Sequence, residues 1–412
     1  MKMIQWRKPE GKTISVLMAG DFCPREENSA FVAENYKEIT AGLKDVFDEA
    51  DIRILQWETV ITQADTPILK QGPNLRCSAD CLNFSKNLGI DVHLLANNHT
   101  GDFGPDAVME TIRHCESANI RTVGAGKNLK DALKPLIFDS PAGKIGIINV
   151  CENEFGIATE DEAGAAPLDV CDNMELIRKT RKEVDILIMA VHGGHEFNPF
   201  PSPRMVKSYR AFAVAGADIV FNCHTHCISG TEVYENVPVV YSPGNFFFPG
   251  DQYSMPSWYF GYLCKFYCDT KGCFGYEIIP YTFDNSRMRL MNEDELQKFE
   301  KHYDFICDTI QDKEKTKKIF DAWSCYFMGN SYLSIINNIK EEKFPPDWNN
   351  EDIIKRWIHI KNDFCCESHN DMMRNYTYLI ANRKVEKAAE YRQLMEEYYQ
   401  PSWMKDLIDN RK

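Results

Sequence analysis

The chain lacks any long apolar stretch. No segment approaches the ~18 consecutive apolar residues of a membrane-spanning helix, and the opening residues, MKMIQWRKPEGKT, contain no apolar core of a secretion signal. These two absences predict a soluble, cytoplasmic protein with no membrane span and no export signal.

Basic charge is also in short supply. The 47 Lys and Arg residues are outnumbered by 61 Asp and Glu residues, which gives a net charge of −14. Proteins that bind nucleic acid present a basic surface to the phosphates, so nucleic acid is not an expected partner. Nothing in the composition indicates an oligomeric state.

Several enzyme signatures are missing as well. The sequence contains no G-x-S-x-G elbow, no glycine-rich phosphate loop before a helix and no C-x-x-C motif. The 15 cysteines are an odd number without a regular framework, which predicts mostly reduced thiols. Metal-dependent hydrolysis is left as the leading class of enzyme.

The first two thirds of the chain alternate short Val- and Ile-rich runs with helical segments. The runs ISVLMAG and DIRILQWE, for example, flank residues 35–50, which have helical spacing. Such alternation is typical of crossover units with parallel strands. A turn at 269–272 predicts a hairpin in a second sheet with an antiparallel edge. We expect an α/β domain over residues 1–285, with its core ending near Phe283.

From Asn292 onwards the pattern becomes helical. Asn292 and Glu295 have the spacing of a capping box, and Pro345-Pro346 should break the helices that follow. Residues 365–400 carry Met, Tyr and Leu at helical spacing, which is typical of a packing face. Residues 286–412 are therefore expected to form a helical extension for packing or assembly, without metal ligands.

Polar side chains follow the ends of the expected strands. In chain order they are Asp21, Glu58, Asn98, His99, His192, His224 and His226. The carboxyl ends of parallel strands meet at one edge of a sheet, so these groups should share a cleft. In extended backbone, His224 and His226 project to one side, and Cys223 and Cys227 to the other. A Cys/His zinc knuckle is the alternative, disfavoured because the cysteines straddle the histidines.

This set of carboxylates, amide and imidazoles suits two divalent metal ions, with Mn, Fe, Zn and Mg left open. Such a pair can activate water between the ions and stabilise both oxygens of a phosphoryl displacement, while His99 protonates the leaving oxygen. Candidate substrate contacts nearby are His195, Glu196, Asp102 and Asn245. Isolated His359 and His369 are expected to be core or surface residues.

Seven ordered motifs identify a family resemblance. They are AGD at 19–21, Trp57-Glu58-Thr59, LANNHTGDFG at 95–104, VGAG at 123–126, HGGHE at 192–196, GADIVFNCHTH at 216–226 and YSPGNFFF at 241–248. From about Ile14 to Phe283 the chain resembles the CapA-type (poly-γ-glutamate capsule synthesis, PGA_cap) proteins of the calcineurin-like metallophosphoesterase superfamily. The resemblance implies a four-layer α-β-β-α sandwich and a dinuclear phosphoesterase.

The resemblance also implies a role for each ligand. Asp21 and His226 would hold one metal, His192, His224 and Asn98 the other, with Glu58 in the bridging position. Asn98 and His99 would be the catalytic pair, His99 as general acid. The substrate would be a small molecule or polymer, expected to be a phosphoester.

The sequence departs from the superfamily pattern in three places. Asp21-Phe22-Cys23 stands where Asp-x-His is usual, and Thr100 stands where an acid is frequent. An N-terminal membrane anchor, present in many CapA relatives, is not found. These departures leave open a second hypothesis, a non-catalytic polymer-binding or scaffold protein of capsule or poly-γ-glutamate biosynthesis.

Overall fold

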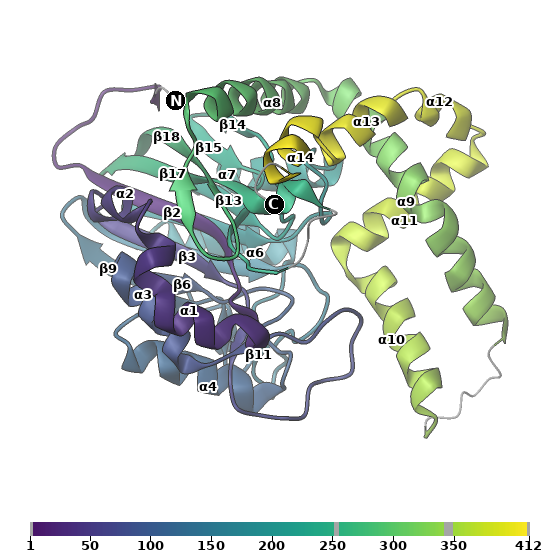
Figure 1. Ribbon diagram of the computed structural model, residues 1–412, viewed down its shortest axis with the longest axis horizontal. Helices are drawn as coiled ribbons and strands as arrows, with labels where there is room; N and C mark the ends of the chain where they lie inside the picture. Colours follow the sequence, from purple (N-terminus) through teal and green to yellow (C-terminus); the bar gives the residue numbers. More distant parts are fainter. Residues whose placement is uncertain (1–2, 251–254, 342–348, 410–412) are drawn as a thin grey trace.

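The computed structural model describes residues 3–250, 255–341 and 349–409. Two large sheets dominate it (Figure 1). The first has the order β1 (Ile4–Gln5), β18 (Gly272–Phe283), β17 (Phe260–Asp269), β2 (Ile14–Phe22), β3 (Ile52–Trp57), β6 (Val92–Leu94), β7 (Arg121–Val123), with β16 (Asn245–Phe247) beside β2 and β19 (Met288–Leu290) beside β18. The second has the order β14 (Thr231–Tyr234), β15 (Val237–Val240), β13 (Ile219–Cys223), β12 (Ile186–His192), β10 (Gly143–Cys151), β9 (Leu136–Ser140).

Alternating side chains hold the layers together. In β12, Ile188 belongs to the apolar cluster shared with the first sheet, whereas Leu187 and Met189 belong to the cluster on the opposite face. Because successive side chains of a strand point to opposite faces, a continuous apolar run buries both sides of the sheet. This is why the parallel strands contain so few polar residues.

Helices cover the outer faces of both sheets. On the first sheet lie α1 (Arg25–Thr40), α2 (Lys44–Asp48), α3 (Leu82–Leu88) and α4 (Pro105–Ser117), and on the second lie α6 (Val170–Thr180) and α7 (Pro203–Ala215). Short connections include η1 (Ala79–Cys81), α5 (Leu129–Ala132), η2 (Pro256–Tyr259) and the strand pairs β4 (Val60–Ile61) with β5 (Arg76–Cys77) and β8 (Ala125–Gly126) with β11 (Gly164–Ala165). The expected four-layer α-β-β-α sandwich is confirmed.

Two local expectations are wrong. The single helix predicted over 35–50 is replaced by α1, which begins at Arg25, and by α2, with a turn after Thr40 between them. The hairpin β17–β18 forms, but it joins the first sheet, where β17 runs antiparallel to β2. Apolar spacing alone gave neither the helix boundary nor the strand partner, because both depend on tertiary contacts.

A helical extension follows the sandwich, as expected. It comprises α8 (Glu293–Gln311), α9 (Lys313–Glu341), α10 (Glu351–Cys365), α11 (Glu367–Ala381), α12 (Val385–Ala389), α13 (Arg392–Tyr399) and α14 (Ser402–Asp409). The capping box at Asn292 and Glu295 is present, whereas Pro345-Pro346 lies outside the described residues. Figure 1 shows α9, α10 and α11 standing beside the sandwich.

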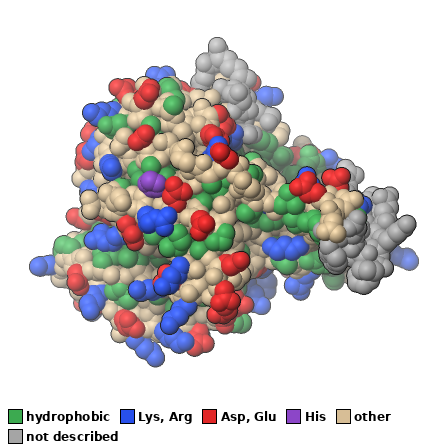
Figure 2. Space-filling model, turned by 90° about the horizontal axis from the view of Figure 1, so that it is seen from below, with side chains coloured by type: hydrophobic (Ala, Val, Ile, Leu, Met, Phe, Trp, Pro, Cys, Tyr) green, Lys and Arg blue, Asp and Glu red, His purple; other side chains and the backbone are tan. Residues whose placement is uncertain are grey.

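Two global expectations can be compared with the described residues. None of their helices is both long and apolar enough to cross a membrane. All 15 cysteines fall within these residues and are free thiols. On the face shown in Figure 2, acidic and basic side chains are interspersed, and no continuous basic stripe runs across it.

The N-terminal segment is fixed to the sandwich by a buried carboxylate. Arg7 donates two hydrogen bonds to Asp269, at 2.6 and 2.7 Å, and the backbone N–H groups of Glu10 and Lys271 also donate to it. Burial alone would raise the pKa of Asp269, but these donors, Arg7 foremost, lower that pKa to about 2.

Replacing Asp269 by Asn should lower the free energy of unfolding by roughly 1.5–3 kcal/mol near neutral pH, the range for hydrogen bonds to charged groups. The folded-state pKa lies below the unfolded value of ~3.9. The wild-type advantage should therefore be complete above about pH 5 and shrink as the pH falls towards the folded pKa. Urea unfolding at several pH values measures it, with exposed Asp139→Asn as control. A deficit that does not change with pH would contradict this interpretation.

Candidate metal centre

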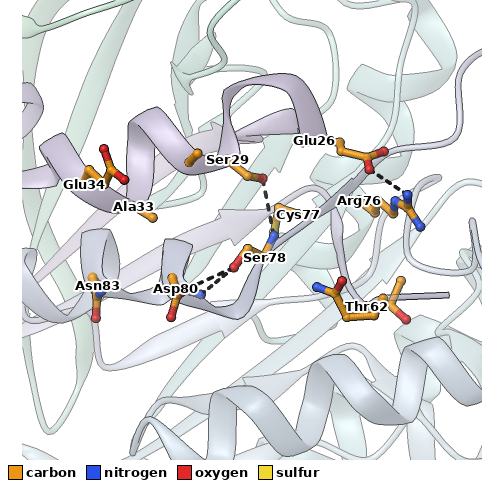
Figure 3. Close-up of a pocket in the computed structure, with 12 residues that line it drawn as sticks. Glu26, Ser29, Ala33, Glu34, Thr62, Arg76, Cys77, Ser78, Asp80 and Asn83 are labelled. Atoms are coloured by element: carbon orange, nitrogen blue, oxygen red, sulfur yellow. Dashed lines mark hydrogen bonds and ion pairs between the residues drawn. The ribbon is translucent and has the colours of Figure 1, made fainter. Parts of the chain in front are cut away.

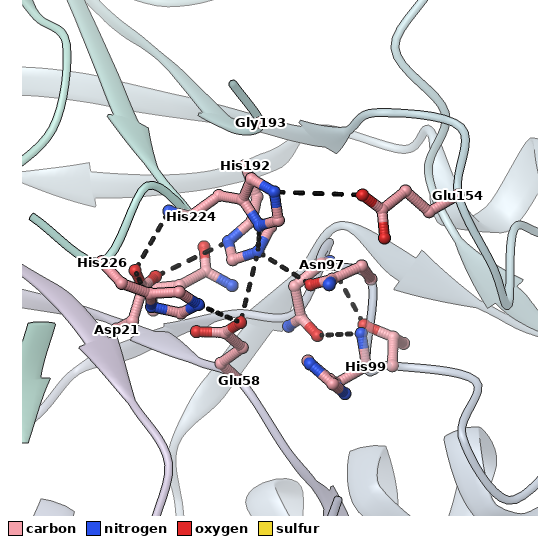
Figure 4. Close-up of polar contacts among 12 residues, drawn as sticks. Asp21, Glu58, Asn97, His99, Glu154, His192, Gly193, His224 and His226 are labelled. Atoms are coloured by element: carbon pink, nitrogen blue, oxygen red, sulfur yellow. Dashed lines mark hydrogen bonds and ion pairs between the residues drawn. The ribbon is translucent and has the colours of Figure 1, made fainter. Parts of the chain in front are cut away.

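Strand ends from both sheets converge on one point (Figure 4). Asp21 lies near the end of β2, Glu58 directly after β3, Asn98 in the loop after β6, His192 at the end of β12, and His224 and His226 just beyond β13. All six positions named in the sequence analysis as metal ligands are therefore brought together. They come from both sheets because the β2–β3–β6 edge and the β12–β13 edge face one another across the sandwich.

The distances between their polar atoms are short. His192 Nε2 lies 3.6 Å from Glu58 Oε1, 3.1 Å from Asn98 Oδ1 and 3.1 Å from His224 Nδ1. His226 Nε2 lies 3.7 Å from the same Glu58 oxygen. Glu58 is thus common to both halves of the cluster.

Two buried carboxyl groups at this point have oxygens that no hydrogen-bond donor reaches. Asp21 Oδ1 and both oxygens of Glu58 accept no hydrogen bond, although both residues are fully buried. Burial raises the pKa of Asp21 to about 7 and the pKa of Glu58 well above its usual range. Buried polar atoms without partners are rare in proteins, and a cation between them would compensate both charges. The donor set therefore fits divalent metal ions.

Close backbone contacts fix the position of Asp21. A side chain at Gly20 would lie 2.0 Å from the Gly244 carbonyl oxygen, so only glycine allows β2 and the loop before β16 to approach this closely. One carboxylate oxygen of Asp21 accepts a hydrogen bond of 3.0 Å from the backbone N–H of His224. The other oxygen remains directed at the cluster.

The two histidines after β13 do not follow the extended backbone that was expected. His224 has φ 97° and His226 φ 53°, so both occupy left-handed conformations that non-glycine residues seldom adopt. The strand ends at Cys223 and the chain turns at once, which brings both rings to the cluster by a tight turn rather than by strand alternation. Cys223 and Cys227 are buried, and neither occurs among the candidate metal-binding groups of the described residues.

His99 is held in a fixed orientation beside the cluster. Its Nδ1 lies 2.8 Å from Asp102 Oδ2 and 3.1 Å from Lys70 Nζ. Burial, and secondarily the Lys70 ammonium, lowers the pKa of His99. Asp102, expected to contact substrate, is fully buried and also accepts from the Leu75 backbone N–H. Asp102 therefore lies behind the His99 imidazole, because Lys70, His99 and the Leu75 N–H already occupy its two oxygens.

Asn245 was likewise expected to contact substrate, and the structure places it elsewhere. Its Oδ1 lies 2.8 Å from His226 Nδ1, and its amide donates to the carbonyl of Trp258. With Nδ1–H donating to Asn245, the Nε2 lone pair of His226 faces Glu58. Such a partner sets the tautomer and direction of a metal-binding imidazole.

A pocket of about 350 Å³ opens beside His224. His195 and Glu196, the other two expected substrate contacts, lie on its wall with Phe197. His195 is buried, and its Nε2 donates to the Ser368 carbonyl, whereas Glu196 is exposed.

The opposite wall comes from the helical extension. Trp323 of α9 and His359 and Asp363 of α10 line it, together with His369 of α11. Sequence reasoning missed these residues, since helical spacing predicted only packing and gave no sign of what the helices face.

Three other residues near the cluster were missed. Lys70 lies in a loop without any periodic pattern, so no sequence signal was available for it. Glu152 and Glu154 follow the end of β10, and the strand-end criterion that selected Asp21 would have found them. Glu154 Oε1 lies 4.0 Å from His224 Nε2, on the far side of that ring from Glu58 (Figure 4).

Cys23, which the sequence analysis noted in place of an expected histidine, is part of the apolar core. Burial raises the pKa of its thiol well above the usual value. It is not among the candidate metal-binding groups formed by the described residues.

A second hollow lies away from the cluster, between α1 and the segment that leads into α3 (Figure 3). Two of its charged groups pair with each other: Arg76 donates to Glu26 at 2.6 Å. The Ser78 hydroxyl caps the turn that begins at Ala79. This hollow contains none of the residues that the sequence predicted for the metal site.

Comparisons with known proteins are consistent with the motifs. The chain is 30% identical to the PGA biosynthesis protein CapA of Bacillus subtilis (strain 168) over 190 residues. The aligned region covers 45% of this chain and 48% of that CapA. Over 188 residues the chain is 30% identical to the capsule biosynthesis protein CapA of Bacillus anthracis, covering 43% and 46%. The chain thus spans about half the length of these relatives.

Solved structures with a related arrangement are more distant. A novel phosphatase from Mycoplasma pneumoniae has a TM-score of 0.43 at 15% identity, covering 69% of this chain and 97% of that one. A 5′-nucleotidase precursor from Thermus thermophilus has a TM-score of 0.40 at 14% identity, covering 70% and 59%. The family match itself extends over residues 15–250, more than half of the sequence. The chain belongs to the bacterial capsule synthesis protein PGA_cap family.

Proposed function

We propose that this protein is a metal-dependent phosphoester hydrolase with two divalent ions at the strand-end cluster. The observation that carries the proposal is the pair of buried carboxylates, Asp21 and Glu58, whose inward oxygens have no hydrogen-bond partner. His226 would complete one site with Asp21, and Asn98, His192 and His224 would complete the other. Glu58 lies within 3.7 Å of an imidazole of each group, which supports a bridging role.

The ions would supply Lewis acidity towards the phosphoryl oxygens and lower the pKa of an attacking water. The protein's own contribution is positioning and proton transfer. Asp102 fixes the His99 ring through Nδ1, so that the ring can protonate the leaving oxygen. An anionic phosphoester beside the ring would raise the pKa that burial and Lys70 lower, and so would favour the protonated imidazole.

The pocket beside His224 supports a compact substrate. Its volume of about 350 Å³ suits a small phosphoester or the end of a polymer chain. Trp323 and Phe327 offer aromatic surface opposite the cluster. The relatives' names, which refer to PGA and capsule biosynthesis, support a substrate from polymer assembly.

A scaffold that binds polymer without catalysis is the second candidate, and burial of Cys23 in the apolar core favours it. With Cys23 in the apolar core, the metal site that contains Asp21 lacks the histidine ligand that usually follows this aspartate. Metal analysis of protein purified without chelator, with phosphomonoester and phosphodiester screens in added Mn²⁺, separates the two. Metal-free protein that stays inactive in Mn²⁺ would favour the scaffold.

Replacing His224 by Ala should abolish both metal retention and activity, because the ring stands between His192 and Glu154 at the centre of the cluster. The loss of metal affinity should exceed the ~10–100-fold typical of changes behind a ligand. Elemental analysis and phosphatase assays measure both quantities. His114→Ala, on α4, is the matched control. If His224→Ala retains its full metal content, His224 is not a metal ligand.

Replacing Asn245 by Ala should weaken metal binding about 10–100-fold, because His226 loses the acceptor that fixes its tautomer. Activity should recover when metal is added in excess, with KM for substrate little changed. Metal titrations of activity, read at several substrate concentrations, distinguish this from direct contact. If the variant instead shows a raised KM with normal metal affinity, Asn245 contacts the substrate directly.

Replacing His99 by Ala should leave metal in place and slow hydrolysis by about 10²–10⁴-fold for a poor leaving group. Nitrophenolate departs without a proton, so the same variant should lose much less rate on a nitrophenyl ester. Parallel kinetics on alkyl and nitrophenyl phosphoesters, with metal analysis, provide the comparison. Equal impairment on both substrates, or loss of metal, would show that His99 is not the leaving-group acid.

A further inference from the structure

The start of α11 is attached to the loop that follows β10. The backbone N–H of Ser368 donates to Glu152 Oε2 at 3.0 Å, and the backbone N–H of Asn153 donates to Glu367 Oε2 at 2.8 Å. The fold therefore brings residues that are far apart in the sequence into one buried junction. This junction lies next to the pocket, and Glu154 within it approaches the strand-end cluster, 4.0 Å from His224 Nε2.

Three groups that bind metals meet in the junction. Glu154, Cys366 and His369 each place one potential ligand atom within 4.8 Å of the other two. Cys366 is the N-cap residue directly before α11, and His369 lies in the first turn of that helix. This Cys-x-x-His spacing puts sulfur and imidazole on the same side of the helix start. Cys366 and Glu154 are buried, at 1% and 8% exposure.

The separation of the sulfur and the carboxylate oxygen matches that of two ligands on a tetrahedral ion. Cys366 Sγ lies 3.6 Å from Glu154 Oε1. With metal–sulfur and metal–oxygen bonds of ~2.3 and ~2.0–2.2 Å, tetrahedral ligands of these kinds lie about 3.5 Å apart. Thiolate, imidazole and carboxylate together form a borderline-soft donor set, which favours Zn²⁺ over Mg²⁺ or Ca²⁺.

The side chains next to Glu154, Cys366 and His369 also fit a metal site. Asn362 Oδ1 is buried without a partner, and the Asn362 amide nitrogen lies 3.3 Å from His369 Nδ1. A half-turn of the amide would let this oxygen accept Nδ1–H and leave Nε2 free for an ion. Glu152 is not available as a ligand, because Arg204 and the Ser368 N–H occupy its two oxygens.

We propose that Glu154, Cys366 and His369 form a further site for a zinc-like ion, which joins the helical extension to the edge of the sandwich. His369 also lines the pocket, so the proposed site borders the pocket wall that the helical extension provides. The site does not depend on phosphoester hydrolysis. It is defined by a thiolate, which the strand-end cluster does not contain.

The thiolate gives the experiment its readout. Full-length protein is stripped with chelator and reloaded with Co²⁺, which produces a near-ultraviolet charge-transfer band only where sulfur binds the ion. The wild type should show the band, Cys366→Ser should lose it, and exposed Cys365→Ser should keep it. Zinc analysis should show one equivalent per chain fewer in Cys366→Ser and in His369→Ala. Circular dichroism confirms that each variant is folded.

Other results separate this proposal from the proposed function. A band that persists in Cys366→Ser and disappears in Cys23→Ser would assign the thiolate to Cys23 and overturn the proposal. Cobalt uptake that depends on His224 but shows no band in the wild type would leave Cys366 as a thiol hydrogen-bonded to Glu154, again overturning it while the strand-end centre stands. Cobalt uptake by neither site would refute both proposals.

Discussion

The burial of two carboxyl groups at one point is the constraint on which the rest of the structure depends. Removing a carboxylate from water costs several kcal/mol unless opposite charge compensates it, and Asp21 and Glu58 are both fully buried. The chain places both carboxyl groups on strand ends of the first sheet and faces them with His192 and His226 from strand ends of the second. Each sheet is rigid because apolar residues fill both of its faces, so the ring positions are determined by the core.

Much of this arrangement was predictable from local sequence. An apolar run of strand length followed by His or Asp places the polar side chain at a sheet edge, and this holds whatever the rest of the chain does. The positions of these six candidate ligands in the chain were therefore visible without tertiary information, whereas the tight turn that directs His224 and His226 at the cluster was not. Residues such as Asp102 and Asn245 are different, because their partners, His99 and His226, are fixed by how loops return over the site. The same residue type can face substrate or stand behind a ligand.

The errors in the fold have a similar origin. Helical spacing over residues 35–50 was visible in the sequence, but the position of the break after Thr40 is a tertiary property, set where the chain must turn back to begin β3. The hairpin β17–β18 was recognised from its turn. Its partner strand was not, because strand alternation specifies a buried face and leaves the neighbouring strand open.

The two walls of the pocket come from different parts of the chain. One wall comes from the strand-end loops, and the other from α9, α10 and α11, which lie beyond residue 250, where the family match ends. The two walls of the pocket are thus encoded in separate stretches of chain, and each can change without the other. Two family members with the same strand-end residues can therefore differ in the shape and chemistry of this pocket, so related sequences are best compared through the C-terminal helices as well.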